Sequence, residues 1–264
     1  MKIGFIGCGN MATAMLKGIL KSGEVKNGDM IASAKSDKTR EKIEKELGIQ
    51  KADTNAQVVD FADVVFLAVK PQFLEEVLDE IKDNVKEGQI FISIAPGKTL
   101  QWLGEHLGEG TKIIRTMPNT PAMVGEGMTA LCVNEQVTEK ETLLAVTLCN
   151  TFGKTEVIPE RLMDAVVGVS GSSPAYVFMF LEAMADAAVA DGMPRAQAYK
   201  FAAQAVLGSA KLMLETGKHP GELKDMVCSP AGTTIEAVRT LEELGFRSSI
   251  IEAMKVCEEV SKSM

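Results

Sequence analysis

The sequence predicts an α/β fold with a parallel sheet covered by helices on both faces, followed by a separate all-helical domain. Over residues 1–159, short apolar runs alternate with helical patterns, which is typical of such a sheet. A glycine-rich turn, Gly7-Cys8-Gly9-Asn10-Met11-Ala12, directly follows the first apolar run. Strand signals stop after Pro159, and only helical patterns remain. We therefore expect two domains, residues 1–159 and residues 160–264.

Six segments of the first domain are expected to be strands, because they are short and rich in β-branched or aromatic residues. They are Lys2–Ile6, Asp29–Ala34, Ala62–Val69, Gln89–Ala95, Lys112–Met117 and Met128–Val133. The first three helices are predicted from about residue 11 to 22, from a cap at Ser36 or Asp37 to residue 47, and from 72 to about 85.

The second domain is predicted to hold four helices, over residues 175–190, 194–215, 234–244 and 247–263. Tyr176, Phe180, Ala183 and Ala187 fall on one face of the first of these helices. Many small residues allow close helix approach. That face belongs either to the core of the helical domain itself or to a subunit interface. The interface is an alternative because about a hundred helical residues make a poor core unless they pack on something else.

The composition of the 264 residues is that of an ordinary globular protein, with 46% hydrophobic and 24% charged residues. The net charge of −8 disfavours binding to nucleic acid or anionic membranes, because both need a basic face. The longest strongly apolar run, Val64–Val69, is far shorter than the roughly 20 residues of a membrane span. With no signal peptide recognisable, we expect a cytoplasmic protein.

The five cysteines are scattered and odd in number, which fits reduced thiols better than disulfides or a metal site. A catalytic cysteine would need a base nearby, and the chain has only His106 and His219, neither in a recognisable motif. We expect no bound metal and no Cys–His chemistry.

The glycine turn is expected to bind the phosphates of a dinucleotide. Gly7 permits the tight turn, Gly9 lets the backbone approach a pyrophosphate, and Ala12 allows close packing of helix on strand. The helix that begins near Met11 offers its free N–H groups to the phosphates. Because the turn lies between a strand and a helix, it indicates a Rossmann-type domain more strongly than the glycines alone would.

The end of the second strand indicates which dinucleotide is preferred. An NAD site usually has Asp or Glu there, whereas this chain has Ser33-Ala34-Lys35-Ser36. The two hydroxyls and the ammonium group suit a 2′-phosphate, so we expect NADPH, with NADH as a second reductant. Replacing both Lys35 and Ser33 by Ala is then expected to raise KM for NADPH much more than for NADH.

A second candidate site is the segment from Ser229 to Glu236. Gly232 followed by Thr233 and Thr234 at a helix start leaves N–H groups free to bind a carboxylate. The spacing of Thr233 and Glu236 is also that of a plain capping box, which would need no ligand. Ser170-Gly171-Ser172-Ser173-Pro174 is a similar helix start, with the proline suited to the first turn.

The chain resembles pyrroline-5-carboxylate reductase, the last enzyme of proline biosynthesis, almost from end to end. Besides the glycine turn, four segments carry the resemblance in the family's order. They are Ala68-Val69-Lys70-Pro71-Gln72, Arg115-Thr116-Met117-Pro118-Asn119-Thr120-Pro121, Ser170-Gly171-Ser172-Ser173-Pro174-Ala175-Tyr176 and Ser229-Pro230-Ala231-Gly232-Thr233-Thr234. One departure is Ala231, where many relatives have glycine; a position that needs positive φ would disfavour alanine.

The resemblance implies a site for each partner of the reaction. It assigns the dinucleotide to the glycine turn, to Ser33–Ser36 and Asn55, and to the segments around Ala68, Val69, Lys70, Pro71 and Asn119. It places the substrate carboxylate on backbone N–H groups of the Gly232-Thr233-Thr234 turn and includes Ser229 in the substrate site. It places the Thr234 hydroxyl beside the substrate nitrogen. It also implies that the helical domain forms a homodimer, and such dimers often assemble into rings.

The chemistry implied is hydride transfer from NAD(P)H to a protonated cyclic imine, which gives L-proline. Because this electrophile already carries its proton, no strong general acid is needed, and positioning supplies much of the rate. Thr234 is the residue expected to act on the substrate; replacing it by Ala should lower kcat/KM by roughly 10-fold or more. Lys70 either orients the cofactor ribose, which its place at a strand end favours, or donates a proton with a lowered pKa.

Two other functions remain open at this stage. A β-hydroxyacid dehydrogenase or imine reductase has a similar plan but relies on a lysine in the long interdomain helix, and residues 175–190 contain none. A nucleotide-binding sensor without chemistry would keep the glycine turn but would not need the segment from Ser229 to Glu236.

Overall fold

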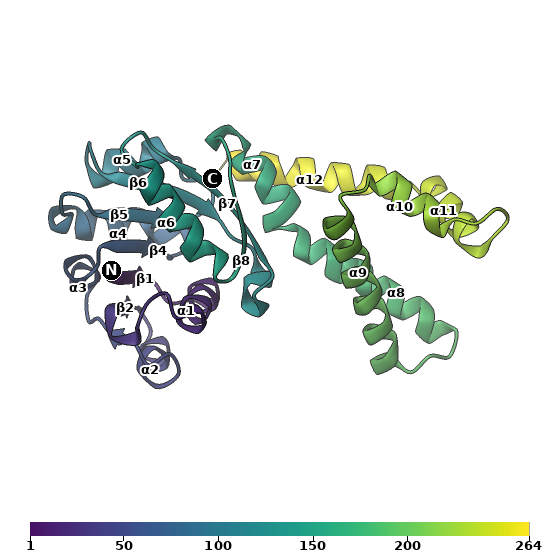
Figure 1. Cartoon of the computed structure of the whole chain (residues 1–264), viewed down its shortest axis with the longest axis horizontal. Coiled ribbons are helices and arrows are strands. Elements are labelled where there is room, and N and C mark those ends of the chain that lie inside the picture. The colour runs from purple at the N-terminus through teal and green to yellow at the C-terminus, as the bar shows by residue number, and fades with distance from the viewer. Residues whose placement is uncertain (264) are drawn as a thin grey trace. The chain divides into compact units, whose positions relative to one another are not determined.

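The computed structural model describes residues 1–263, which divide into two compact units (Figure 1). The first, here the α/β unit, comprises residues 1–172 and the end of the chain from residue 257. The second, the helical unit, comprises residues 173–256. The domain boundary expected at residues 159/160 stays a prediction.

The α/β unit is built on one eight-stranded sheet with the strand order β3-β2-β1-β4-β5-β6-β7-β8. All neighbouring strands are parallel except β6 and β7, which are antiparallel. The strands are β1 (Ile3–Ile6), β2 (Met30–Ser33), β3 (Gln50–Lys51), β4 (Val64–Leu67), β5 (Ile90–Ser93), β6 (Lys112–Met117), β7 (Gly127–Val133) and β8 (Gly153–Val157). The six predicted strands are confirmed, and the sheet is parallel as expected apart from the one antiparallel pair, β6–β7.

Helices cover both faces of this sheet (Figure 1). They are α1 (Asn10–Ser22), α2 (Asp37–Lys45), α3 (Asn55–Phe61), α4 (Leu74–Ile81), α5 (Leu100–Leu107), α6 (Glu139–Asn150) and the short α7 (Met163–Val166), which runs into a π-helical turn, η6 (Val167–Gly171). Helices α1, α2 and α6 pack on one face and α3, α4 and α5 on the other. Successive strand side chains point to opposite faces: Phe5 and Phe66 stack with ring centroids 4.5 Å apart on one side, and Ile6 and Leu67 lie in the core on the other.

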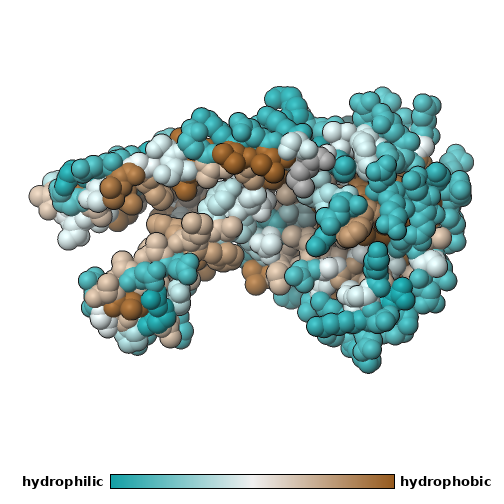
Figure 2. Space-filling view, turned by 180° about the vertical axis from the view of Figure 1, so that it is seen from behind, coloured by the Kyte–Doolittle hydropathy of each residue, from teal (hydrophilic) through white to brown (hydrophobic). Residues whose placement is uncertain are grey.

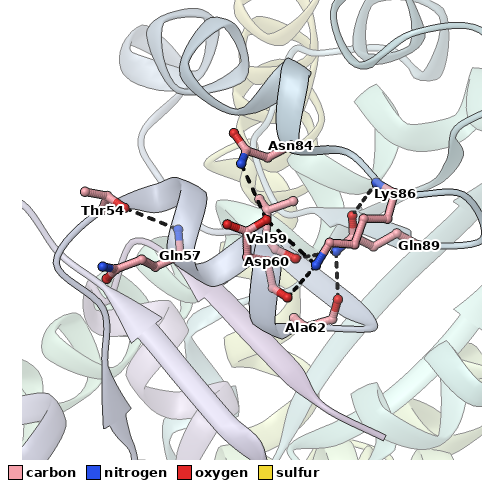
Figure 3. Close-up of polar contacts among 8 residues, drawn as sticks. All are labelled: Thr54, Gln57, Val59, Asp60, Ala62, Asn84, Lys86 and Gln89. Atoms are coloured by element: carbon pink, nitrogen blue, oxygen red, sulfur yellow. Dashed lines mark hydrogen bonds and ion pairs between the residues drawn. The ribbon is translucent and has the colours of Figure 1, made fainter.

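Helix α3 is held at its C-terminal end by a buried glutamine from the turn before β5 (Figure 3). Gln89, 4% exposed, donates from Nε2 to the carbonyl oxygens of Val59 and Ala62, both at 2.7 Å, and accepts from the Lys86 N–H at 3.0 Å. These bonds satisfy carbonyls that a helix end leaves without partners. At the other end, the Thr54 hydroxyl caps α3 by accepting from the Gln57 N–H. The helix is therefore fixed at both ends, and Asn55 is its first residue.

The helical unit contains α8 (Ser173–Ala190), α9 (Arg195–Thr216), α10 (Pro220–Val227), α11 (Thr233–Glu243) and most of α12 (Phe246–Lys262). The four predicted helices are confirmed, and Pro174 lies in the first turn of α8 as expected. Helix α10 was not predicted. In α8 and α9 only Ala185, Ala198 and Ala202 are buried in the single chain, and brown apolar surface is visible on these helices (Figure 2).

Among the described residues, one helical stretch, Glu160–Ala190, has the length and apolar composition of a membrane span, and only 11% of its most apolar window is buried. A helix that packs against a second subunit has the same composition. The stretch is thus weak evidence for a membrane span. It does show that this part of the single chain leaves apolar surface uncovered.

Candidate functional site

The turn between β1 and α1 has the shape that its glycines predict. Gly7 has φ of 93°, and a Cβ there would lie 2.6 Å from the Ala68 carbonyl oxygen, so only glycine fits. Gly9 is the N-cap of α1, no side chain caps this helix, and a Cβ at Gly9 would meet no atom within 4 Å. The N–H groups of Asn10 and Met11 therefore begin the helix beside open space, where a pyrophosphate can approach them.

A pocket of about 760 Å³ opens beside this turn, at the carboxyl ends of β1, β2 and β4. The strand order reverses at β1–β4, which is where dinucleotides bind in sheets of this kind. The pocket brings together Gly7, Gly9, Ser33, Lys35, Asn55, Ala68, Val69 and Lys70, all predicted to contact the cofactor. The pocket wall does not include Asn10, Met11, Pro71 and Asn119, and their contact with the cofactor stays a prediction.

One end of the pocket is suited to a phosphate group. Ser36 is the N-cap of α2 and accepts from the Thr39 N–H at 3.3 Å, and the two hydroxyls lie 2.8 Å apart. Arg40 donates from Nε to the Ala34 carbonyl at 2.7 Å, which turns its guanidinium along the β2–α2 turn. The Lys35 ammonium lies over the Phe73 ring, 5.3 Å from its centre. Sequence reasoning missed Thr39 and Phe73, although the capping position of Ser36 was a usable signal for Thr39.

Behind the phosphate end, Ser33, Asn55 and Glu80 form a chain of hydrogen bonds. The buried Ser33 hydroxyl donates to Asn55 Oδ1 at 2.7 Å, and Asn55 Nδ2 donates to Glu80 Oε2 at 2.6 Å. The other oxygen of Glu80 accepts from the Asn55 N–H at 3.3 Å, at the start of α3. Sequence reasoning missed Glu80, because it is one of several acidic residues on the exposed side of α4 and only the strand order brings it to Asn55.

The segment after β4 also lines the pocket. The Ala68 N–H donates to the Ile6 carbonyl at 2.8 Å, which continues the β1–β4 pairing past the strand end. Lys70 has an extended backbone, precedes Pro71 and accepts from the Phe73 N–H at 2.9 Å, so its backbone is fixed by the turn. Its side chain is exposed and has no hydrogen bond or ion pair with residues 1–263. The ammonium is therefore free to contact a bound cofactor.

The Asn119 side chain is hydrogen-bonded to other parts of the protein. Its Nδ2 donates to the carbonyl and the hydroxyl oxygen of Ser170, both at 3.2 Å, and its Oδ1 accepts from the Met128 N–H at 2.8 Å. It is 9% exposed. Nearby, a Cβ at Gly171 would lie 2.6 Å from the Met117 side chain. The Met117-Pro118-Asn119 segment is thus joined to the π-helical turn η6, and a positioning role for Asn119 accounts for these contacts.

The candidate substrate turn lies within the helical unit. The Gly232 N–H donates to the Ser229 carbonyl at 3.0 Å, and Ala231 between them has φ of 56°. Gly232 is the N-cap of α11 and no side chain caps this helix, so the capping box considered for Thr233 and Glu236 is wrong. Glu236 instead pairs with Arg239 at 3.1 Å. The first N–H groups of α11 therefore remain available for an anion.

The buried cysteines and the two histidines have surroundings that fit a role in the structure and not in catalysis. Burial raises the pKa of Cys8, and it raises the pKa values of Cys132 and Cys149 to about 12, so these three stay protonated thiols. His219 caps α10 by accepting from the Gly221 N–H at 3.1 Å, and the His106 ring contacts the Trp102 carbonyl. No group of three or more metal-ligating side chains occurs within residues 1–263.

The order of the strands, the open glycine turn and the pocket at the strand ends together define a protein with a Rossmann-type dinucleotide-binding domain. Comparisons with known proteins then narrow this class. The family model described as "Pyrroline-5-carboxylate reductase dimerisation" matches residues 160–264, and the one described as "NADP oxidoreductase coenzyme F420-dependent" matches residues 2–97.

Full-length relatives agree with the family models. Pyrroline-5-carboxylate reductase of Escherichia coli K12 is 55% identical over 263 residues, which cover 100% of this chain and 98% of that protein. The crystal structure of 1-pyrroline-5-carboxylate reductase from Streptococcus pyogenes matches with a TM-score of 0.91 at 35% identity, covering 100% of this chain and 99% of that one. A Plasmodium falciparum pyrroline carboxylate reductase with NADP bound matches with a TM-score of 0.90 at 30% identity, covering 100% and 97%. The chain therefore belongs to the pyrroline-5-carboxylate reductase family.

Proposed function

We propose that this protein reduces 1-pyrroline-5-carboxylate to L-proline, with NADPH as its preferred hydride donor and NADH as an alternative. The observation that carries the proposal is the 55% identity to a reductase of this name over the whole chain. The reaction adds a hydride to the carbon of a protonated C=N bond, and the reduced cofactor becomes the oxidised nicotinamide. This assignment replaces the sensor and the hydroxyacid dehydrogenase that the sequence had left open.

The residues of the pocket fit a dinucleotide. The open space beside Gly9 accepts a pyrophosphate, and the first N–H groups of α1 face it. At the other end, Lys35, Ser36 and Arg40 lie where a 2′-phosphate needs positive charge and hydroxyl donors. Lys70 lines the pocket directly after the end of β4, and this place supports orientation of the cofactor over proton donation. The reduced nicotinamide, when bound, supplies the hydride.

The substrate carboxylate is bound by the turn Ser229–Thr234. Positive φ at Ala231 and the Ser229–Gly232 hydrogen bond shape this turn, so the N–H groups at the start of α11 are free. Helix α11 spans 11 residues, enough for its N-terminal end to favour an anion. Thr234, second residue of the helix and partly buried, presents its hydroxyl to the ring nitrogen and orients the iminium carbon. Because the substrate arrives protonated, this hydroxyl needs to hold a geometry, not to supply an acid.

The functional unit is a homodimer formed through the helical unit, and dimers associate further into a ring. Support comes from the dimerisation family model over residues 160–264 and from the exposed apolar side chains of α8 and α9. The protein acts in the cytoplasm on a small soluble substrate. The net charge of −8 supports the absence of nucleic-acid and membrane partners.

The test is the loss of reduced-nicotinamide absorbance with 1-pyrroline-5-carboxylate, followed in parallel with NADPH and NADH while proline is quantified. Oxidation of the cofactor with equimolar formation of proline, faster with NADPH, is the expected result. Tight dinucleotide binding without turnover would contradict the proposed reaction and return the sensor as the better explanation.

A further inference from the structure

Glu80 controls the direction of the hydrogen bonds in the Ser33–Asn55–Glu80 chain at the phosphate end of the pocket. A carboxylate has only acceptor oxygens, so the Asn55 side chain must turn its Nδ2 toward Glu80, at 2.6 Å. This leaves Asn55 Oδ1, an acceptor, facing Ser33 at 2.7 Å. The single proton of the Ser33 hydroxyl is consequently given to Asn55, and Ser33 offers only lone pairs to the pocket.

With only lone pairs facing the pocket, Ser33 suits NADH better than NADPH. The 2′-hydroxyl of NADH can donate to a lone pair of Ser33. The 2′-phosphate of NADPH has only acceptor oxygens near neutral pH, so it would need the Ser33 proton. Turning that proton outward would leave Asn55 Oδ1 without a donor, at the cost of about one hydrogen bond. Rotating the amide of Asn55 instead would aim its oxygen at Glu80.

We propose that Glu80 is a specificity-determining residue: acting through Asn55 and Ser33, it limits the preference for NADPH and keeps NADH usable. This inference rests on the proposed function, in which Ser33 and Asn55 face the ribose of the dinucleotide. It also separates two residues that the sequence had grouped. Lys35 favours the 2′-phosphate through its charge, whereas Ser33 favours the 2′-hydroxyl.

The test is Glu80→Gln, measured as the dissociation constants of NADP⁺ and NAD⁺ by calorimetry on the full-length protein without substrate. The glutamine amide can either accept from or donate to Asn55, so both orientations of the Asn55 amide become accessible and Ser33 can donate to the phosphate. The ratio Kd(NAD⁺)/Kd(NADP⁺) is expected to rise about five-fold beyond the effect of charge alone, corresponding to one neutral hydrogen bond.

The matched control is Glu76→Gln. Glu76 lines the same pocket from the same helix, one turn earlier, and has no hydrogen bond to Asn55. It therefore reports the effect of removing one negative charge near the phosphate. Equal shifts of the ratio in the two variants, or no shift in Glu80→Gln, would overturn the inference.

Ser33→Ala distinguishes failure of the inference from failure of the proposed site. We expect Ser33→Ala to weaken the binding of NAD⁺ more than the binding of NADP⁺. When Ser33 is already Ala, Glu80→Gln should change the ratio Kd(NAD⁺)/Kd(NADP⁺) no more than Glu76→Gln does. If Ser33→Ala leaves both dissociation constants unchanged, Ser33 does not face the dinucleotide, and the site assignment fails together with the inference. If dinucleotides bind as expected but no imine is reduced, the proposed reaction fails while the role of Glu80 stands.

Discussion

Ala231 has a backbone conformation that side chains rarely adopt. Within residues 1–263 it alone combines a Cβ with positive φ, 56°. For an L-residue this region costs roughly 1–2 kcal/mol, and glycine avoids that cost. The sequence marked Ala231 as a departure from the glycine of its relatives, and the structure shows that the turn keeps the glycine conformation with alanine in place.

Replacing Ala231 by Gly should therefore relieve the turn. The gain is partly offset by the greater freedom of glycine in the unfolded chain, so we expect a net stabilisation of about 0.5 kcal/mol. Ala231→Val should act in the opposite direction, lose more than about 1 kcal/mol and raise KM for the imine, because a β-branched residue fits positive φ poorly. Thermal unfolding and steady-state kinetics of both variants check this; a stabilising valine would contradict it.

Thr234 is the residue on which the proposed chemistry depends most directly. Thr234→Ala should lower kcat/KM by about 10-fold or more, because a well-placed hydrogen bond of about 1.4 kcal/mol is lost. Thr234→Ser should restore most of the rate. Thr240→Ala is the matched control, since Thr240 lies on the same helix and its hydroxyl, within the part of the chain that the structure describes, bonds to the Glu236 carbonyl alone. Equal losses for Thr234→Ala and Thr240→Ala would indicate damage to α11 and remove Thr234 from the mechanism.

Among the secondary-structure elements, α3 links the stability of the sheet to the cofactor site, because it begins at Asn55 and ends in the Gln89 network (Figure 3). Gln89→Leu would leave the carbonyls of Val59 and Ala62 without their donors in a buried position. We expect a loss of about 2–3 kcal/mol in the free energy of unfolding and weaker dinucleotide binding, measured by denaturant unfolding at fixed protein concentration and by calorimetry.

Asn84→Ala provides the comparison for Gln89→Leu. Asn84 makes one contact to Asp60, at 3.4 Å near the surface, so its loss should change stability by less than about 0.5 kcal/mol. If the two variants are equally stable, the buried bonds of Gln89 do not hold α3 in place.

The elements that the sequence predicted correctly are those whose burial leaves a strong apolar pattern. Strands β1, β2, β4, β5, β6 and β7 are all covered on both faces. The two edge strands were missed, because the two residues of β3 are exposed and β8 (Gly153–Val157) is largely polar. Helix α10 was missed for another reason: a proline soon after a helix is typical of a helix end, but Pro220 is the first residue of α10.

The candidate site divides in the same way. The glycine turn and the residues at strand ends are local in sequence, so Gly7, Ser33 and Lys70 could be predicted, and the structure gathers them in one pocket. Glu80 and Thr39 could not be predicted, because their roles depend on which helix lies beside which strand. The capping box at Thr233 had the right spacing, but the turn before α11 makes Gly232 the cap.

Considered as a whole, the molecule is incomplete as a single chain. Large apolar side chains of α8 and α9 are open to solvent, among them Phe178 at 64%, Phe201 at 69% and Leu214 at 84% exposed. Monomeric soluble proteins rarely expose apolar side chains in such density. The dimerisation family model covers this region, so a second copy of the chain is the partner that buries it.

A charge placed on that surface should separate the subunits without unfolding the α/β unit. Phe201→Glu is expected to convert the dimer to monomers in sedimentation experiments, because the carboxylate would have to be buried without a partner. Activity should be lost, since the substrate turn lies in the same helical unit. The dinucleotide pocket is built wholly within the α/β unit and should still bind NADP⁺.

Leu143→Glu is the control for Phe201→Glu. Leu143 is 65% exposed but lies on α6 of the α/β unit, so this variant should remain dimeric and active. A dimeric Phe201→Glu alongside a dissociated Leu143→Glu would place the interface on the α/β unit and contradict the assignment.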